Sequence, residues 1–447
     1  MDRNKYLGEY WPTYPSAPEN CRDLRDLALA VKVTPPEGPR WYGGRVQGVD
    51  DSLVILADVW GNHLKLHNQH LSPVASGAGE WCKVLRSGDI VAVKLHSSKV
   101  TKVEGMCIYE GDLRAELVLL SIAQRQPMSL SVDPQRLVLW QRFLQTVRNY
   151  FSQHGFIEVN TPTLVVCPGM EPELEPFSTA FEMGRRWEQW FLPTSPELHM
   201  KKLLGQGLYP IFEIKSCFRN GEISAHHQPE FLMLEWYEAF VGLDSVQNHI
   251  QGLVEELRKH SMVVGEVSPL EVVTLPDLFK RHLGERLTPQ TTYDELAAWA
   301  KERDVYLAGD ETWNDLFHLL FLSFIEPKLI QYGPLILRKF PPQQAALARL
   351  DAEGWADRFE FYWRGLEIGN AFHELNHPDE QRRRFQQDIV TRYEKGRAKV
   401  PLDEEFLKTL DAGMPPSSGI AIGLERLFLA CQNLQDLKQV RLFPKDE

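Results

Sequence analysis

The sequence predicts an α+β protein in which a small, mainly β domain precedes a larger domain with an antiparallel sheet flanked by helices. Three observations predict it. Apolar residues alternate with a period of two between residues 41 and 124. They then recur at helical spacing over residues 137–151. Beyond residue 156, strands and helices mix without a βαβ rhythm, and neither GxGxxG nor a phosphate-binding P-loop occurs.

Composition indicates a globular protein of two or three domains. The 447 residues are 43% hydrophobic and 25% charged. No apolar run is long enough for a membrane span, and the N-terminus lacks the apolar core of a secretory signal. Six scattered cysteines without a CxxC pair argue against a zinc site or a disulfide scaffold, so a cytoplasmic location is expected. The net charge of −12 makes the chain a poor general nucleic-acid surface, although a local basic patch could still exist.

Residues 1–128 are expected to form the first domain. A leader rich in proline and charge, with one short helical stretch, reaches residue 40. About five short strands separated by Gly and Asp turns follow, which is typical of a small closed barrel and predicts an OB-like fold. The lysines at 94, 99 and 102 are interpreted as a solvated edge strand rather than as a nucleic-acid patch.

Residues 129–447 are expected to form the second domain. Asp133 is a suitable N-cap, Pro134 suits the first helical position, and Gly155 closes the helix. The stretch Phe156–Val165 then predicts a strand. Pro162 near its end favours an edge or an interface, because proline cannot donate to a ladder.

Two alternating runs, residues 211–218 and 231–240, predict a β-hairpin. On its return strand Glu235 and Tyr237 share a face with Phe231 and Met233. A carboxylate among apolar side chains is costly without a cationic partner, so this face is predicted to line a polar cavity. A structural glutamate is the alternative.

The polar loop of this hairpin, "RNGEISAHHQPE", carries Arg219, His226 and His227. Together these side chains could hold an anion such as a phosphate. The alternative is a cluster of surface ion pairs.

A second acidic stretch is "RFEFYWRGLEIGNAFHELNHPDE". On adjoining strands Glu360 and Glu367 could face one hard cation, which prefers oxygen ligands. Alternation places Asn370 and Glu374 on one face. Residues 373 and 377 are interpreted as solvated histidines rather than as a metal pair.

Near the C-terminus, "SSGIAIGLERLFLACQNL" predicts a glycine-rich strand that runs into an amphipathic helix, with Arg426 in its first turn. Gly419 and Gly423 would let a ligand or another backbone approach closely.

Three of these stretches resemble the signature motifs of the class II aminoacyl-tRNA synthetases. "FIEVNTP" is similar to motif 1, "FRNGEISAHHQPEF" to motif 2 and "GIAIGLER" to motif 3. "TSPELHMKKLL", "EIGNAFHELN" and "RLFP" resemble the lysyl branch. Within that branch, "TSPE", "MLEWY" and "NAFHEL" look more like the ligases that modify a lysine of elongation factor P. Ala421 supports this likeness, since lysyl-tRNA synthetases usually have glycine there. The match covers about residues 133–444.

This resemblance implies roles at the nucleotide. Arg219 would bind the α-phosphate and the substrate carboxylate. Arg219 and Arg426 are the implied catalytic residues, because they place positive charge where the transition state gains negative charge. His226 would contact the γ-phosphate of ATP, with His227 beside it. The adenine ring would stack between Phe231 and Arg426.

The resemblance also implies roles at Mg²⁺ and at the amino acid. Glu360 and Glu367 match the magnesium-binding pair. Glu197 would take an amino group of the substrate, and Glu374 would pair with its distal ammonium. The implied substrate-binding residues are Glu197, Glu235, Tyr237, Asn370, Glu374 and Ala421. Buried carboxylates and a phenol select a diamino acid, because a neutral side chain would leave them unpaired. Pro162 would lie at the interface of a homodimer.

The chain departs from the family pattern at two points. The motif Arg-x-Glu has Gly221 at its glutamate position, and the glutamate follows one place later as Glu222, an expected ATP contact. The ligases lack an N-terminal domain, whereas synthetases carry an anticodon-binding OB domain there.

The expected function is ATP-dependent activation of lysine or β-lysine as an adenylate, followed by transfer to a lysine of elongation factor P. One alternative is a divergent lysyl-tRNA synthetase that charges tRNA(Lys). Another is a catalytically silent paralogue that serves as a binding module.

Overall fold

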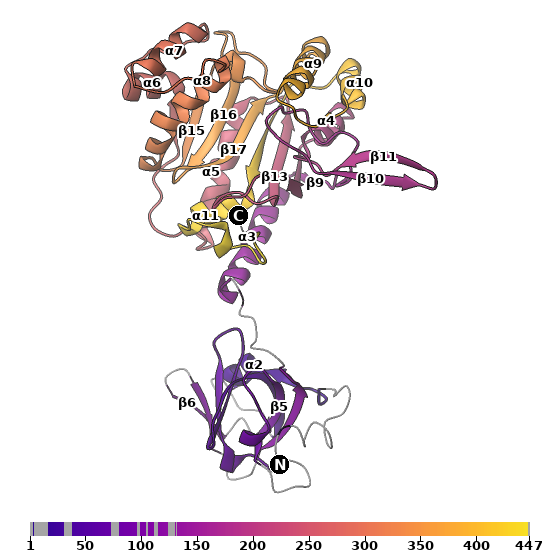
Figure 1. Ribbon diagram of the computed structural model, residues 1–447, viewed down its shortest axis with the longest axis vertical. Coiled ribbons are helices and arrows are strands. Elements are labelled where there is room, and N and C mark those ends of the chain that lie inside the picture. Colours follow the sequence, from indigo (N-terminus) through magenta and orange to yellow (C-terminus); the bar gives the residue numbers. More distant parts are fainter. Residues whose placement is uncertain are drawn as a thin grey trace. The chain divides into compact units, whose positions relative to one another are not determined.

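A computed structural model describes Arg3 and residues 17–30, 38–72, 80–95, 99–103, 106–110, 115–123, 130 and 132–445. The chain divides into two compact units, Met1–Gln135 and Arg136–Glu447 (Figure 1). The predicted domain boundary at 128/129 lies outside the described residues, as does most of the predicted leader.

The first unit is mainly β. Its elements are β1 (Arg22–Asp23), α2 (Leu24–Ala30), β2 (Arg40–Val49), β3 (Leu53–Ala57), β4 (His63–His67), η1 (Asn68–His70), η2 (Trp81–Lys83), β5 (Ile90–Leu95), β6 (Val100–Val103), β7 (Met106–Tyr109) and β8 (Glu116–Ser121). The strands pair in the order β6-β7-β4-β3-β2-β5-β8. Ala115, just before β8, bridges in parallel to Leu71, shortly after β4. β8 therefore joins both ends of the β4-β3-β2-β5 run, as in a five-stranded OB barrel.

The second unit is built on a large sheet. Its strands are β9 (Ile157–Glu158), β12 (Ile211–Phe218), β13 (Glu230–Ala239), β14 (Glu271–Thr274), β15 (Leu335–Phe340), β16 (Ala356–Trp363), β17 (Leu366–His373) and β18 (Ser417–Gly423). They pair in the order β14-β15-β16-β17-β18-β13-β12-β9. All neighbours are antiparallel except the two edge pairs. The predicted α+β class is confirmed.

Helices cover this sheet. They are α3 (Pro134–Gln153), α4 (Glu197–Gly205), α5 (Leu243–Lys259), α6 (Leu275–Leu283), α7 (Tyr293–Lys301), α8 (Trp313–Leu320), α9 (Pro378–Glu394), α10 (Glu404–Ala412) and α11 (Leu424–Gln432), with short turns η4 (Phe321–Ile325), η5 (Glu326–Gln331), η6 (Pro342–Gln344) and η7 (Leu437–Gln439). α5 contacts β17 and β18, whereas α11 contacts β13, β17 and β18. α4 packs against α10. A separate hairpin of β10 (Ser178–Met183) and β11 (Arg186–Phe191) projects from the unit (Figure 1).

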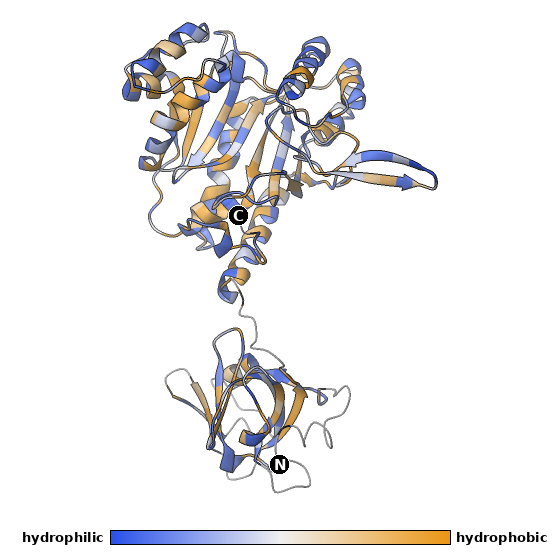
Figure 2. Ribbon diagram, in the orientation of Figure 1, coloured by the Kyte–Doolittle hydropathy of each residue, from blue (hydrophilic) through white to orange (hydrophobic). Residues whose placement is uncertain are grey.

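Hydrophobic residues concentrate in the central strands and in the helices beside them (Figure 2). The core between α3, the sheet and α11 includes Phe143, Trp236, Ile420 and Phe428, all nearly inaccessible to solvent. The predicted helix is confirmed as α3.

The strand predicted over Phe156–Val165 is much shorter than expected. Only Ile157–Glu158 are in β9, and the last ladder bond runs from the amide of Val159 to Phe212 O. The amide of Thr161 donates to the Glu213 carboxylate, and Pro162 has no amide hydrogen to donate. A side chain therefore replaces the ladder at this edge.

A substitution at Gly419 would show how tightly the central strands pack. A Cβ there would overlap the Tyr237 ring and lie 2.7 Å from Trp236 O. We expect Gly419→Ala to lower the free energy of unfolding by about 1–3 kcal/mol, because a backbone oxygen cannot move aside cheaply. Urea unfolding followed by circular dichroism measures this loss. Gly423→Ala on the same strand is the matched control, since its Cβ would meet only Arg426 atoms at 3.8 Å or more. Equal stabilities of the two variants would contradict the prediction.

Candidate active site

A cavity of about 350 Å³ lies over β13, β17 and β18 and beside the β12–β13 loop. It brings together nine of the predicted residues: Arg219, Glu222, His226, His227, Phe231, Glu367, Asn370, Ala421 and Arg426. Seven further residues complete the lining: Gln228, Met233, Ile368, Gly369, Gly423, Glu425 and Leu437. Five predicted residues are not among the lining residues: Glu197, Glu235, Tyr237, Glu360 and Glu374.

Strand register explains why distant residues meet here. Glu235 on β13 and Asn370 on β17 both pair directly with Ala421 on β18. Glu360 on β16 pairs in turn with Asn370. Residues directly opposite one another point to the same face of a sheet. The Ala421 methyl thus lies between the carboxylate of Glu235 and the amide of Asn370.

The part of the cavity beside the β12–β13 loop contains a stacked pair. The Arg219 guanidinium lies 5.0 Å from the centre of the Phe231 ring. Nη1 of Arg219 is 3.9 Å from Oε2 of Glu222, which is an ion pair too long for a hydrogen bond. Gly221 adopts φ +82°, so the turn takes up the extra residue before Glu222. The displaced glutamate therefore still faces the arginine.

Arg426 fixes the protonation of His227. Its Nη2 donates to Nε2 of His227, its Nε donates to His226 O at 3.3 Å, and its Nη1 donates to Glu367 O at 2.9 Å. Burial and the positive charges of Arg426 and Arg219 lower the pKa of His227 to about 4. The neutral ring consequently carries its proton on Nδ1, which donates to Ser224 Oγ at 2.8 Å.

Glu360 and Glu367 come from the neighbouring strands β16 and β17. Oε1 of Glu360 accepts from Arg358 at 2.6 Å, and Oε2 accepts from the Tyr362 hydroxyl at 3.0 Å. Burial raises the pKa of Glu360 to about 7. The positive charge of Arg358 opposes this rise, and the negative charge of Glu367 adds to it. Burial and Glu367 likewise raise the pKa of Glu326. Mutual repulsion of this kind is relieved by a bound cation.

The structure does not place a complete metal cage around these carboxylates. Among the described residues no group of three or more His, Cys, Asp or Glu is arranged to hold a metal ion. Mg²⁺ in nucleotide sites commonly takes one or two carboxylates together with phosphate oxygens and water. The pair Glu360 and Glu367 fits that mode.

An ion triad joins α4 to the end of β17. Nζ of Lys201 is 2.5 Å from Glu197 Oε1 and is ion-paired with Glu374 Oε2. The Lys201 side chain is 1% exposed. Burial alone would lower the pKa of Lys201, but the two carboxylates raise it above its ordinary value. Burial, reinforced by Glu197 and opposed by Lys201, raises the pKa of Glu374 to about 8.

Glu235 and Tyr237 form a second buried pair. The Tyr237 hydroxyl donates to Glu235 Oε2 at 3.0 Å. Burial, with the nearby Glu197, raises the pKa of Glu235 well above its ordinary range. The carboxylates thus exceed the cations on this side.

Several buried polar atoms around the site lack a hydrogen-bond partner within the described part of the chain. They are Arg219 Nε, His226 Nε2, Glu235 Oε1, Asn370 Oδ1 and Glu374 Oε1. Unsatisfied buried polar groups are rare in native proteins, so a concentration of them indicates a ligand site.

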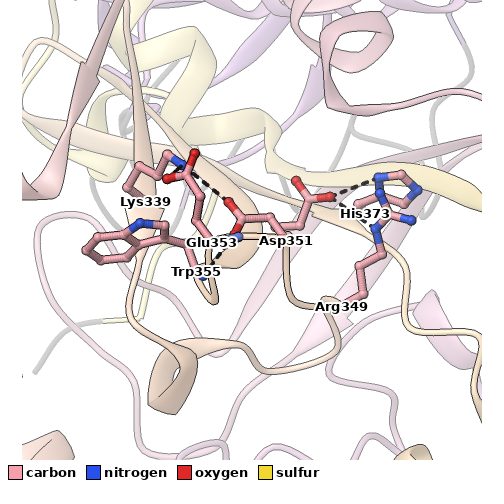
Figure 3. Close-up of polar contacts among 7 residues, drawn as sticks. Lys339, Arg349, Asp351, Glu353, Trp355 and His373 are labelled. Atoms are coloured by element: carbon pink, nitrogen blue, oxygen red, sulfur yellow. Dashed lines mark hydrogen bonds and ion pairs between the residues drawn. The ribbon is translucent and has the colours of Figure 1, made fainter. Parts of the chain in front are cut away.

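A charged network anchors the strand end that carries Glu374 (Figure 3). His373 is buried, and its Nδ1 lies 3.1 Å from Asp357, which also accepts from Arg349 at 3.1 Å. The predicted solvated state of His373 is therefore wrong, because alternation along β17 turns this residue away from Glu374 and toward Asp357. Lys339, at 2.8 Å from Glu353, holds the adjoining loop (Figure 3).

Sequence reasoning also missed Glu425. Both of its oxygens accept from the amide of Leu232, at 3.0 and 2.9 Å, so it ties α11 to β13. Burial raises the pKa of Glu425 to about 7. Its place beside Arg426 in "GLER" was the only signal in the sequence.

Comparison with known proteins identifies the family. The family described as tRNA synthetases class II (D, K and N) matches residues 131–447. The chain belongs to this family. The match begins after the N-terminal barrel strands, and the family that the three motifs predicted is confirmed.

Relatives of this class II chain include proteins named elongation factor P–(R)-β-lysine ligase. The ligase of Haemophilus influenzae (strain PittGG) is 34% identical over 321 residues, 71% of this chain and 97% of that protein. The ligase of Edwardsiella ictaluri (strain 93-146) is 37% identical over 311 residues, 68% and 93% respectively. The ligase of Pasteurella multocida (strain Pm70) is 34% identical over 318 residues, 70% and 96%.

The triad around Lys201 yields a stability prediction. Lys201→Met leaves Glu197 and Glu374 buried without their cation, so we expect a loss of about 3–5 kcal/mol in the free energy of unfolding. Urea unfolding followed by fluorescence measures it. Lys395→Met removes the exposed pair with Glu173 and should change stability by no more than about 0.5 kcal/mol. A similar loss in both variants would contradict the prediction that the buried triad contributes more to stability than an exposed ion pair.

Proposed function

We propose that this class II synthetase-like protein activates lysine or β-lysine with ATP as an aminoacyl-adenylate and transfers it to a lysine of elongation factor P. The observation that carries the proposal is the excess of buried carboxyl groups. Glu197 and Glu374 share the single ammonium of Lys201, and the buried Glu235 has no ion pair with it. A diamino acid supplies the missing cations, whereas a neutral side chain would leave these groups unpaired.

The nucleotide assignments stay proposals, supported by the cavity. Arg219 binds the α-phosphate and the substrate carboxylate, and its partnerless Nε supports this role. His226 contacts the γ-phosphate through its free Nε2. Adenine stacks between Phe231 and Arg426, which line the same cavity.

Glu360 and Glu367 are the residues that would hold Mg²⁺, which supplies charge neutralisation at the phosphates. The chain's own contribution to the first step is positioning and positive charge. Arg219 orients the substrate carboxylate for in-line attack on the α-phosphate, and Arg426 adds charge on the opposite side of the nucleotide. Activation requires no protein nucleophile.

Elongation factor P is the proposed acceptor because the relatives are named elongation factor P–(R)-β-lysine ligase. Ala421, which pairs with both Glu235 and Asn370, supports the likeness to these ligases, since lysyl-tRNA synthetases usually have glycine there. Charging of tRNA(Lys) is the second candidate, favoured by the N-terminal barrel whose strand pairing resembles an OB fold. A silent binding module is disfavoured because the catalytic set converges on one cavity. The boundary at 128/129 also stays a proposal, supported by the compact units Met1–Gln135 and Arg136–Glu447.

The setting proposed for this reaction is the cytoplasm. All six cysteines of the chain lie in described residues and are free thiols, as expected in a reducing compartment. No helix in the described ranges is long and apolar enough to span a bilayer.

Two assays test the function. We expect ATP–pyrophosphate exchange with lysine or β-lysine, followed by transfer of the labelled aminoacyl group to elongation factor P and not to tRNA(Lys). Arg219→Ala should reduce exchange by about 100-fold or more, because it removes charge at the reacting phosphate. Efficient charging of tRNA(Lys) would instead establish the second candidate. Absence of exchange with every diamino acid would overturn both.

We further propose a homodimer formed around Pro162. The neighbouring Ile157, Leu164 and Val166 expose 48%, 37% and 53% of their surface, and β9 is an edge strand. Contiguous exposed apolar residues at a sheet edge favour association. Sedimentation velocity should give twice the chain mass of 51.5 kDa. Leu164→Lys combined with Val166→Lys should give the monomer mass, whereas Tyr306→Lys, an exposed control, should not. A monomeric wild type would refute the proposal.

A further inference from the structure

Glu171 is a half-buried acid that none of the roles above uses. It lies in the segment between β9 and β10, and its Oε2 has almost no exposed surface and no partner among the residues described. Gly169 makes room for it. A Cβ at Gly169 would lie 2.6 Å from Glu171 Oε2 and 2.5 Å from Thr194 Oγ1. The carboxylate is therefore next to Thr194, three residues before Glu197.

The backbone around Glu171 is held from both sides. Nη1 of the buried Arg392 donates to the carbonyl oxygens of Glu171 and Leu174, at 2.8 and 2.6 Å. Thr194 donates through its amide and its hydroxyl to Pro168 O, at 3.1 and 2.9 Å. The main chain is thus fixed on either side while Oε2 of the carboxylate has no partner among the described residues. A preorganised acid with a buried oxygen of this kind is expected where a ligand supplies the partner.

Hydrogen bonds place the segment of Glu171 beside both groups proposed for one end of the substrate. Thr194, three residues before Glu197, donates to Pro168 O, and the amide of Asn220, next to Arg219, donates to Glu175 O at 2.7 Å. Burial and the charge of Glu197 raise the pKa of Glu171, whereas Arg219 and Lys201 oppose that rise. Asp388 is also near enough to be affected by Glu171. Glu197 and Arg219 are the groups proposed for the substrate's amino group and carboxylate. The segment that carries Glu171 consequently lies beside the residues proposed for the carboxyl end of the substrate.

We propose that Glu171 is a specificity residue that binds, together with Glu197, the amino group nearer to the carboxyl group of the diamino acid. The inference rests on the proposed function, because it requires a diamino acid in this pocket. An ammonium has three N–H donors, and two carboxylates provide matched acceptors for it. Glu374 and Glu235 remain for the distal ammonium, so each end of the substrate has its own acids.

Ligand truncation combined with mutation tests this assignment. Isothermal titration calorimetry compares lysine and β-lysine with 6-aminohexanoate, which lacks the amine near the carboxyl group. We expect Glu171→Gln to weaken binding of lysine and β-lysine by about 10- to 100-fold, the range for a lost charged hydrogen bond. Binding of 6-aminohexanoate should change by no more than about twofold, because that ligand never contacted Glu171.

Asp388→Asn is the matched control. Burial, Glu171 and Glu173 raise the pKa of Asp388 to about 7, so its ionised form is disfavoured like that of Glu171. Asp388 is not part of the proposed pocket. The ratio of lysine affinity to 6-aminohexanoate affinity should stay at the wild-type value in this variant. A lowered ratio would mean that any nearby acid affects the pocket, and the inference would be abandoned.

The remaining outcomes also test the role proposed for Glu171. Equal weakening of all three ligands by Glu171→Gln would assign the residue a structural role and overturn the inference, as would unchanged lysine affinity. If the variant does not fold, Glu171→Asp takes its place. That shorter acid withdraws its oxygens and should lower the lysine to 6-aminohexanoate ratio, and an unchanged ratio would overturn the inference. A wild type that binds 6-aminohexanoate and lysine equally would overturn it too. Failure to bind any of the three ligands would overturn the proposed function itself.

Discussion

The buried ion triad of Glu197, Lys201 and Glu374 is the constraint on which the arrangement of the second unit depends. Glu197 and Lys201 are one turn apart on α4, and Glu374 follows β17. A charge buried without its partner costs several kcal/mol, so α4 must dock where these groups meet. The triad thereby fixes α4 to the strand end that carries Glu374.

The sheet register does the rest of the positioning. A single row across β16, β17, β18 and β13 presents Glu360, Asn370, Ala421 and Glu235 on one face. Gly369 approaches the carbonyl oxygen of Ala421 so closely that a Cβ would lie 2.6 Å from it. The strands supply Asn370 and Ala421 to the cavity, and the β12–β13 loop supplies Arg219, His226 and His227.

Sequence reasoning reached the fold class and the hairpin because alternation is a local signal. It placed Glu235 and Tyr237 on one face, and the structure joins them by a hydrogen bond. The spacing of Glu197 and Lys201 is also local, yet the third partner of the triad is set by tertiary packing and left no trace in the pattern. Glu171 was invisible for the same reason: its segment has no period.

His373 shows how one face of a strand can mislead. A histidine next to a glutamate near a strand end reads as solvated, but the His373 side chain is buried in the structure. The side chain opposite the pocket must then find a buried partner, which is Asp357. Burial of the second face depends on helices that the strand pattern alone does not reveal.

The turn, and not the strands, accommodates the one-place shift of the motif 2 glutamate to Glu222. The hairpin keeps its register to the end, with Cys217 opposite Phe231, and the amide of Arg219 still donates to Pro229 O at 2.9 Å. Gly221 absorbs the extra residue in a left-handed conformation that most side chains avoid. Because the insertion is confined to the loop, Arg219 retains its stacking on Phe231. The one-place shift of the glutamate along the sequence thus does not prevent Arg219 from stacking on Phe231.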